Sequence, residues 1–215
     1  MNQDIIVVAT RNRGKAAEIA DLLAGRPIRV MSLADFGPMP EAVENAETFE
    51  DNAYLKARHY ARVLGLPCLA DDSGLTVEAL GGAPGVYSAR YAGENADDAA
   101  RCAKLLGEMA EKTDRRAAFV CALVLAAPSG PGLTWLGRVE GEILREPSGD
   151  NGFGYDPVFF YPPLNRTFAQ LTREEKNQVS HRGRALADFI LELDKVLVWV
   201  RQRLAEARPP HSCQH

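Results

Sequence analysis

The sequence predicts an α/β fold in which helices pack on a long mixed β-sheet. Residues 5–9 form a continuous apolar run, mostly β-branched, which is typical of a central strand buried on both faces. A polar loop and a helical pattern follow this run, as in a strand–loop–helix unit. Further along, residues 117–126 and 133–144 are two strand patterns separated by a proline- and glycine-rich turn, which predicts an antiparallel hairpin.

Composition and charge are those of a globular protein. The chain of 215 residues is 46% hydrophobic and 25% charged, which are ordinary values. Its formal net charge of −4 gives no global basic field for duplex nucleic acid. The sequence has no apolar run of membrane-spanning length, and its first residues lack a signal-peptide pattern. We therefore expect a cytoplasmic protein without a membrane or duplex partner.

The domain organisation is predicted to be simple. No repeat or linker divides the chain, so residues 1–204 are expected to form one domain and residues 205–215 a flexible tail. The cysteines show no metal-binding spacing and are expected to be reduced thiols. They are Cys68, Cys102, Cys121 and Cys213.

The N-terminal part of the chain predicts two helices and two further strands. Residues 16–23 place apolar side chains on one helical face, and residues 28–31 form a strand pattern. Thr48 is a helix N-cap, and Gly65 ends that helix. The apolar run 68–70 then predicts a short buried strand.

The C-terminal part predicts three helices and one strand besides the hairpin. Residues 95–109 form a helix opened by Asn95, and residues 158–160 form a short strand. Thr172 begins a capping box, and Ser180 begins a single last helix with an apolar stripe. The stripe consists of Leu186, Phe189, Ile190, Leu193, Val196, Leu197 and Val200.

Two adjacent carboxylates, Asp71 and Asp72, stand where the strand over residues 68–70 is expected to end. Neighbouring strand residues point to opposite faces, so both cannot face the core. In open α/β sheets, ligands bind outside the carboxyl ends of strands, and two acids there repel each other unless a cation or a shared proton relieves them. The stretch fits either a metal-assisted site or a solvated turn.

The loop from Thr10 to Lys15 connects the first strand to a helix N-terminus, where backbone N–H groups and the helix dipole favour anions. Asn12 and Lys15 are within reach of phosphate oxygens in such a loop. The loop lacks the second glycine and the Lys-Ser/Thr pair of a Walker loop. Its alternative interpretation is a solvated basic turn.

A glycine-rich loop and an unusual helix start complete the candidate features. Glycines flank Phe153, which fits a loop that stacks an aromatic ring on a flat ligand, or a plain glycine turn with the ring tucked inward. His181 and Arg182 are expected in the first turn of the last helix, where the dipole disfavours cations. Their position suggests a functional role.

Acidic, basic and aromatic groups of this kind suit a nucleotide polyphosphate with a divalent cation, because phosphoryl chemistry depends mostly on positioning and charge neutralisation. The sequence shows no Ser-His-Asp order, nucleophilic cysteine signature or zinc spacing that would indicate another chemistry.

Six ordered motifs between Ile5 and about Leu197 resemble the inosine triphosphate pyrophosphatase (Ham1-like) family. They are Ala9-Thr10-x-Asn12-x-Gly14-Lys15-x-x-Glu18, Glu44-x-x-x-Thr48-Phe49-x-x-Asn52-Ala53-x-x-Lys56-Ala57, Ala70-Asp71-Asp72-Ser73-Gly74-Leu75, Gly81-Gly82-x-Pro84-Gly85-x-Tyr87-Ser88-Ala89-Arg90, Gly152-Phe153-Gly154-Tyr155-Asp156-Pro157 and Ser180-His181-Arg182-Gly183. Their agreement in order makes the resemblance far more specific than any one motif.

The resemblance implies hydrolysis of ITP, dITP and XTP to the monophosphate and pyrophosphate, with Mg²⁺ and in a homodimer. It also implies two lobes that flank a central substrate cleft. Asp72 would be the proton acceptor and a metal ligand, Glu44 a further metal ligand, and Ser73 a substrate contact. The implied phosphate contacts are Thr10, Arg11, Asn12, Arg13, Gly14, Lys15 and Lys56. The implied contacts to the nucleotide, mainly its base, are Phe153, Gly154, Tyr155, Asp156, Lys176, His181 and Arg182.

The chemistry of the substrate agrees with these roles. Water is a poor nucleophile toward a polyanion, so a carboxylate must orient and deprotonate it while Mg²⁺ screens the phosphate oxygens. A 6-keto purine presents an acceptor where adenine presents an amino donor, so donors from Arg182, His181 or loop N–H groups favour hypoxanthine and xanthine. A mispaired buried donor costs about 1–3 kcal/mol, which disfavours ATP but not GTP, since guanine also carries the 6-keto group.

Two other functions compete with this interpretation. A Maf-like pyrophosphatase would act on other nucleotides, but the motifs around Phe153 and Arg182 argue against it. A nucleotide-binding sensor without turnover would have no need of the base Asp72 or the ligand Glu44.

Overall fold

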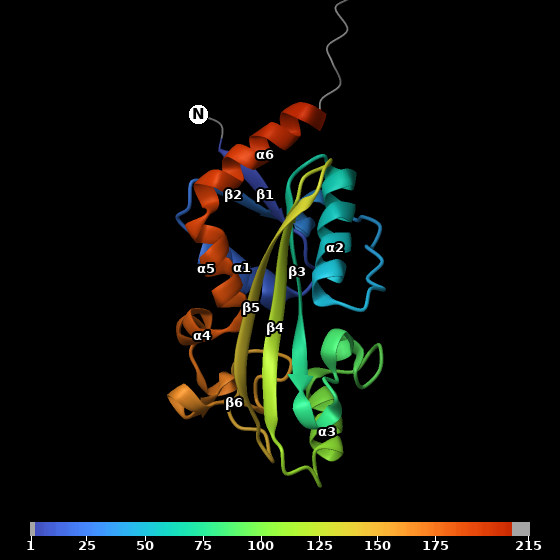
Figure 1. Ribbon diagram of the computed structural model, residues 1–215, viewed down its shortest axis with the longest axis vertical. Coiled ribbons are helices and arrows are strands. Elements are labelled where there is room, and N and C mark those ends of the chain that lie inside the picture. The colour runs from blue at the N-terminus through green and yellow to red at the C-terminus, as the bar shows by residue number, and fades with distance from the viewer. Residues whose placement is uncertain (1–2, 208–215) are drawn as a thin grey trace, which may run out of the picture.

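The computed structural model describes residues 3–207, and within these residues seven strands form one mixed sheet in the order β2-β1-β3-β4-β5-β6-β7 (Figure 1). The strands are β1 (Asp4–Val8), β2 (Ile28–Ser32), β3 (Cys68–Val77), β4 (Arg116–Ala126), β5 (Gly132–Ile143), β6 (Phe159–Tyr161) and β7 (Arg166–Thr167). The α-helices are α1 (Arg13–Leu23), α2 (Phe49–Leu64), α3 (Asp98–Glu108), α4 (Arg173–Val179), α5 (His181–Leu191) and α6 (Leu193–Ala207). The predicted mixed α/β fold is confirmed.

The hairpin of β4 and β5 runs the length of the molecule, and the helices cover both faces of its upper part (Figure 1). On one face, α2 packs on alternate residues of β1, β3 and β4. On the other face, α1, α5 and α6 form a second hydrophobic cluster with the intervening residues. A third cluster joins α3 to the far ends of β3, β4 and β5 and to β6. The sheet therefore connects an upper lobe to a lower lobe.

The expectation that the strand ends at Ala70 is wrong. β3 continues through both aspartates to Val77, because β4 pairs with it in antiparallel register from Cys68 to Val77. The parallel neighbour β1 pairs with β3 only as far as Leu69. Asp71 and Asp72 therefore lie in the middle of β3, beside the carboxyl end of β1, and the edge of the sheet opens at that point.

Most helix boundaries agree with the sequence signals. Thr48 caps α2 by accepting a hydrogen bond from the N–H of Asp51, and Gly65 ends α2 in the left-handed conformation. Thr172 forms the predicted capping box of α4. The N-cap of α3 is Asp97 and not Asn95, because the Asp97 side chain accepts from the N–H of Ala100.

The single last helix predicted from the apolar stripe is two helices. The chain leaves helical geometry at Glu192 (φ −98°, ψ 3°), whose carboxylate accepts a hydrogen bond of 2.8 Å from Trp135 Nε1 on β5. The stripe still packs on one core, since Phe189, Leu193 and Val200 belong to the same cluster.

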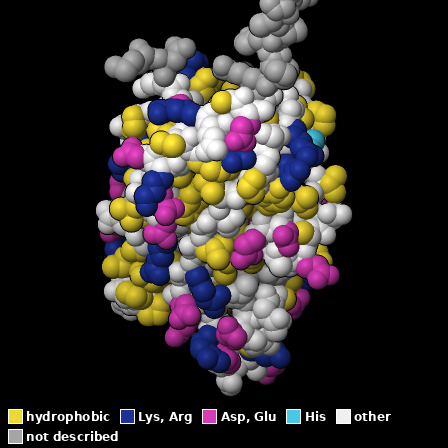
Figure 2. Space-filling model, turned by 45° about the horizontal axis from the view of Figure 1, so that its top comes forward, with side chains coloured by type: hydrophobic (Ala, Val, Ile, Leu, Met, Phe, Trp, Pro, Cys, Tyr) yellow, Lys and Arg dark blue, Asp and Glu magenta, His cyan; other side chains and the backbone are white. Residues whose placement is uncertain are grey.

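The remaining expectations concern the tail, the cysteines and the surface. Residues 205–207 continue α6, and the rest of the expected tail, with Cys213, lies outside the described residues. Cys68, Cys102 and Cys121 are buried free thiols. Over residues 3–207, no helix combines the length and apolarity needed to cross a membrane. Acidic and basic side chains alternate over the face drawn in Figure 2.

Two glycines let α5 begin in direct contact with its neighbours. A Cβ on Gly137 of β5 would lie 1.9 Å from the carbonyl oxygen of His181. A Cβ on Gly183 of α5 would lie 1.8 Å from the carbonyl oxygen of Asn177. The neighbouring atoms are backbone in both cases, so they cannot rotate away, and the start of α5 is fixed against β5.

We expect Gly137→Ala to lower the free energy of unfolding by about 1–3 kcal/mol, because the added methyl group overpacks a backbone contact. Urea denaturation followed by circular dichroism measures this change. Gly107→Ala in α3 is the matched control, since nothing lies within 4 Å of its Cβ position. Alanine there should leave stability unchanged or raise it by about 0.5–1 kcal/mol. Equal effects of the two substitutions would contradict the packing argument.

Candidate active site

A cavity of about 310 Å³ lies between the two lobes and collects most of the predicted site residues. This volume is in the range of small-molecule binding sites. The predicted residues that line it are Thr10, Arg11, Asn12, Lys15, Glu44, Lys56, Asp72, Ser73, Phe153, Gly154, Tyr155, Asp156, Lys176, His181 and Arg182. Arg13 and Gly14 do not line it.

The two adjacent aspartates have different environments because the strand alternates its faces. Asp71 is fully buried, whereas Asp72 is half-buried and lines the cavity. Asp71 accepts hydrogen bonds from Arg182 Nη2 (3.0 Å) and Ser73 Oγ (2.9 Å), and it pairs with Lys15 Nζ at 3.2 Å. Burial alone would raise the pKa of Asp71, but Lys15 and Arg182 outweigh it and hold the pKa well below its ordinary value. Asp71 is therefore an ionised, structural carboxylate.

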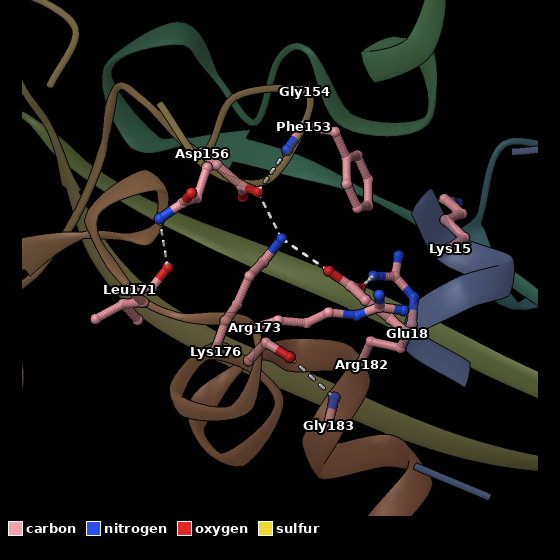
Figure 3. A network of polar contacts seen from close by, with 12 residues as sticks. Lys15, Glu18, Phe153, Gly154, Asp156, Leu171, Arg173, Lys176, Arg182 and Gly183 are labelled. Carbon is pink, nitrogen blue, oxygen red and sulfur yellow. Dashed lines mark hydrogen bonds and ion pairs between the residues drawn. The ribbon is translucent and has the colours of Figure 1, made fainter. Parts of the chain in front are cut away.

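A buried chain of charges continues from Arg182 to the glycine-rich loop (Figure 3). Glu18 of α1 contacts both Arg182 Nη1 and Lys176 Nζ, the latter at 2.9 Å. Lys176 also pairs with Asp156 Oδ2, which accepts a hydrogen bond of 2.9 Å from the N–H of Phe153. These contacts connect α1, α4, α5 and the loop. The carboxylates among them balance the positive charge of Arg182 at the start of α5.

Glu18 is a functional residue to which the sequence analysis gave no role. Its side chain is 6% exposed, and burial alone would raise its pKa. The opposing charges of Arg182 and Lys176 lower the pKa overall. Glu18 lies three residues after Lys15, on the same face of α1. That spacing was the available signal that both side chains act in one site.

The opposite end of the cavity holds a second charged group built around Lys56. Lys56 Nζ lies 2.6 Å from Glu44 Oε2 and donates to the carbonyl oxygen of Asp71 at 3.1 Å. Burial would lower the pKa of Lys56, but Glu44 and Asp72 raise it overall. Burial raises the pKa of Asp72 above its ordinary value, and Asp71 and Glu44 add to this effect against the opposing lysines.

The loop that carries Glu44 is anchored to α2. Asn52 accepts from the N–H of Ala46 at 2.9 Å and donates to the carbonyl oxygen of Ala46 at 3.2 Å. Asn52 is buried, so this two-bond contact fixes the loop against the helix that also supplies Lys56. Glu44 and Lys56 are thus presented by one structural unit.

The donor set of Glu44 and Asp72 suits a hard cation. In residues 3–207, no group of three or more His, Cys, Asp or Glu side chains is arranged to hold a metal ion. Mg²⁺ commonly binds through one or two carboxylates together with substrate phosphates and water. Glu44 and Asp72 line the same cavity, and the charge of Glu44 acts to raise the pKa of Asp72, a repulsion that a bound divalent ion would relieve.

The loop before α1 has the geometry of an anion site. Asn12 is the N-cap of α1, and its side chain accepts from the N–H of Lys15 at 3.0 Å. The first turn contains no acidic residue, and the helix dipole at this end favours an anion. Arg11 pairs with Glu41 and donates to the carbonyl oxygen of Met39.

Gly14 has a packing role in this structure. A Cβ at this position would lie 2.7 Å from the ring of Phe153, so the ring rests directly on the start of α1. The same ring lies 4.5 Å from Lys176 Nζ, and its centroid is 5.8 Å from the Arg182 guanidinium carbon. Phe153 is therefore placed between the two lobes and not exposed on a free turn.

The imidazole of His181 faces the cavity from the buried start of α5. Its ring stacks on Phe119 with centroids 4.8 Å apart, and its Nδ1 has no hydrogen-bond partner among the described residues. Burial, assisted by Arg182 and Lys176, holds the pKa of His181 well below its ordinary value. A neutral imidazole here can donate one hydrogen bond and accept another.

Comparison with known proteins places the whole described chain in one group of enzymes. The model of the Ham1 family matches residues 6–191. A dITP/XTP pyrophosphatase of Desulfotalea psychrophila is 53% identical over 211 residues, which are 97% of this chain and 95% of that protein. The dITP/XTP pyrophosphatase of Syntrophobacter fumaroxidans is 57% identical over 206 residues, 96% of this chain and 89% of that protein.

Solved structures agree with this grouping. The structure of a HAM1 protein from Coxiella burnetii superposes with a TM-score of 0.83 at 46% identity, covering 90% of this chain and 100% of that one. The Staphylococcus aureus Ham1 protein gives a TM-score of 0.81 at 42% identity, with the same coverage.

We expect Glu18→Gln to lower the free energy of unfolding at neutral pH by about 3–5 kcal/mol, because it leaves Arg182 and Lys176 without one of their buried counter-charges. Denaturant titration measures the change. Asp21→Asn on the same helix is the matched control, since Asp21 pairs with Arg173 at the surface and should contribute little. If the two variants lose the same free energy of unfolding, Glu18 does not stabilise the protein as a buried counter-charge.

The stabilities of the wild type and of Glu18→Gln should also respond differently to acid. Because the pKa of Glu18 is lowered in the folded protein, its contribution to stability is present above the unfolded value of about 4.3 and is lost as the pH falls below it. Stability of the wild type should therefore fall more steeply below about pH 4 than that of Glu18→Gln.

Proposed function

The chain belongs to the Ham1 family, and on that premise we propose that it hydrolyses dITP, ITP and XTP to the nucleoside monophosphate and pyrophosphate. One observation carries the proposal: the carboxylates Asp72 and Glu44 line the same cavity as Phe153 and Arg182. One small-molecule site therefore holds both a base that can activate water, Asp72, and an aromatic ring that can stack on a purine, Phe153. We also propose the homodimer that the family resemblance implies and the cytoplasmic location that the sequence predicts.

The phosphate end of the site is formed by α1 and α2. The helix dipole at the start of α1 would attract phosphate oxygens, and Lys15 and Lys56 would supply positive charge. Glu44 and Asp72 would hold Mg²⁺, which neutralises charge on the phosphate oxygens when bound. Each lysine is paired with a carboxylate in this structure, so neither ammonium is buried without compensation.

Asp72 is the proton acceptor of the proposed reaction. A water oxygen bonds to the α-phosphorus, the bond from this phosphorus to the bridging oxygen breaks, and pyrophosphate leaves with the bonding electrons. The proton of the water passes to Asp72. Asp72 lines the cavity and can reach a water bound there, whereas Asp71 is fully buried and paired with Lys15 and Arg182.

The purine end of the site is formed by the loop around Phe153 and the start of α5. Phe153 would stack on the base, and donors from Lys176, His181 or loop N–H groups would bond to the 6-keto oxygen. Arg182 uses all three nitrogens in hydrogen bonds to Asp71, Ser73 and Glu18. If Arg182 contributes to base recognition as proposed, it does so with N–H groups that already bond to these three residues.

The experiment that tests the function is a substrate panel. With Mg²⁺, pyrophosphate release from dITP and XTP should exceed that from dATP by about one to two decades in kcat/KM, because adenine mispairs with buried donors. EDTA should abolish the release. A preference for dTTP would favour a Maf-like enzyme, and binding of dITP without turnover would favour a sensor; either result would overturn the proposal.

A second test addresses the proton acceptor. We expect Asp72→Asn to lower kcat for dITP by about 10²- to 10⁴-fold while nucleotide binding persists, because the amide cannot accept the proton of the attacking water. Stopped assays give kcat, and calorimetry gives the affinity for dITP. Asp114→Asn is the control, since Asp114 pairs with Arg116 outside the cavity. A wild-type rate in Asp72→Asn would remove Asp72 from the mechanism.

A further inference from the structure

Gly154 follows Phe153 in the chain, and two residues of α3 bind its N–H and its carbonyl group. The N–H of Gly154 donates to Asp98 Oδ2 at 2.6 Å, and the carbonyl oxygen of Gly154 accepts from Cys102 Sγ at 3.4 Å. Gly154 has a φ of +66°, a conformation that side-chain-bearing residues rarely adopt. The position of this turn is therefore fixed by contacts from outside the loop.

Asp98 is itself held in place by the elements around it. It pairs with Arg101, three residues further along α3. Arg101 Nη1 donates to the carbonyl oxygens of Ala89 and Ala96, each at 2.8 Å. These contacts attach the start of α3 to the short 3₁₀ helix η3 (Gly85–Arg90), to which the loop is also bonded through Tyr155 Oη and the carbonyl oxygen of Ser88, at 2.9 Å.

The loop is thus anchored to two different parts of the molecule. Asp156 and Lys176 connect it to the buried ion cluster. Asp98 connects it to α3. Asp98 and Arg101 also line the cavity, although our sequence reasoning gave neither a role. Without Asp98, the N–H of Gly154 would lose its charge-assisted acceptor, and on the α3 side only the weaker contact of Cys102 with the Gly154 carbonyl would remain.

We propose that Asp98 is a positioning residue for the purine end of the site. By accepting the hydrogen bond from Gly154, it sets the place of Phe153 before the nucleotide binds. The proposal rests on the proposed function only in assigning the purine to Phe153. Its physical content is that a pre-organised stacking platform binds the base without an ordering cost.

The neighbouring aspartate offers a control in the same turn. Asp97 is the N-cap of α3, and its side chain accepts from the N–H of Ala100 at 2.7 Å. Asp97 therefore stabilises the helix, whereas Asp98 reaches out of the helix to the loop. Loss of either carboxylate removes one acidic residue from the helix start, but only loss of Asp98 removes the acceptor of the Gly154 N–H.

The test compares Asp98→Ala, Asp98→Asn and Asp97→Ala in the full chain. We expect Asp98→Ala to raise KM for dITP about tenfold, because a charge-assisted hydrogen bond that orders the binding loop is lost. Its kcat should stay within about twofold, since the groups at the α-phosphorus are untouched. Asp98→Asn keeps an acceptor oxygen and should give an intermediate KM. Asp97→Ala should leave KM unchanged.

Hydrogen–deuterium exchange without nucleotide gives a readout that does not depend on turnover. Exchange in peptides covering residues 150–156 should be faster in Asp98→Ala than in the wild type and unchanged in Asp97→Ala. Equal exchange in the three proteins, or equal KM values for Asp97→Ala and Asp98→Ala, would overturn the proposal. If the wild type fails to hydrolyse dITP, the proposed function fails, and the exchange comparison still decides whether Asp98 positions the loop.

Discussion

The active site depends on a buried cluster in which three carboxylates meet three cations. Its members are Asp71, Glu18 and Asp156 with Lys15, Arg182 and Lys176. A charge taken out of water costs several kcal/mol unless it is paired and hydrogen-bonded, so each member constrains the positions of the others. The cluster joins β3, α1, α4, α5 and the loop around Phe153, and it thereby sets the geometry of the whole cavity.

This cluster also explains why two neighbouring aspartates have opposite properties. β3 points Asp71 toward the cations of the cluster and Asp72 toward the cavity. Asp71 is stabilised as an anion, whereas Asp72 has a raised pKa because it is partly buried near other carboxylates. The alternation of a strand, which is a property of the backbone, therefore separates a structural acid from a candidate base without any difference in residue type.

Local signals predicted the elements that depend on local interactions. The helix α2 begins after Thr48 and ends before Gly65 as expected, and the turn after Ala126 connects the two strands of the long hairpin. Apart from the N-cap of α3, which is Asp97 and not Asn95, the errors lie where residues distant in the sequence decide the structure. Asp, Ser and Gly resemble a turn, but the register with β4 keeps them in a strand. Glu192 ends α5 where it meets Trp135, 57 residues away, and Glu18 pairs with Arg182, 164 residues away. Periodicity carries no information on such contacts.

The helix α1 connects the two ends of the candidate site. Lys15 and Glu18 extend from the same face of α1, the first at the phosphate end and the second in the cluster below the purine platform. A helix is rigid over one turn, so the distance between the two ends is set by a fixed backbone and not by a flexible loop. A disturbance of the cluster at Glu18 therefore reaches the phosphate end through α1. A disturbance at Asp98 acts on the loop through Gly154 and removes no member of the cluster, and this separates the binding of the base from the placement of the phosphates.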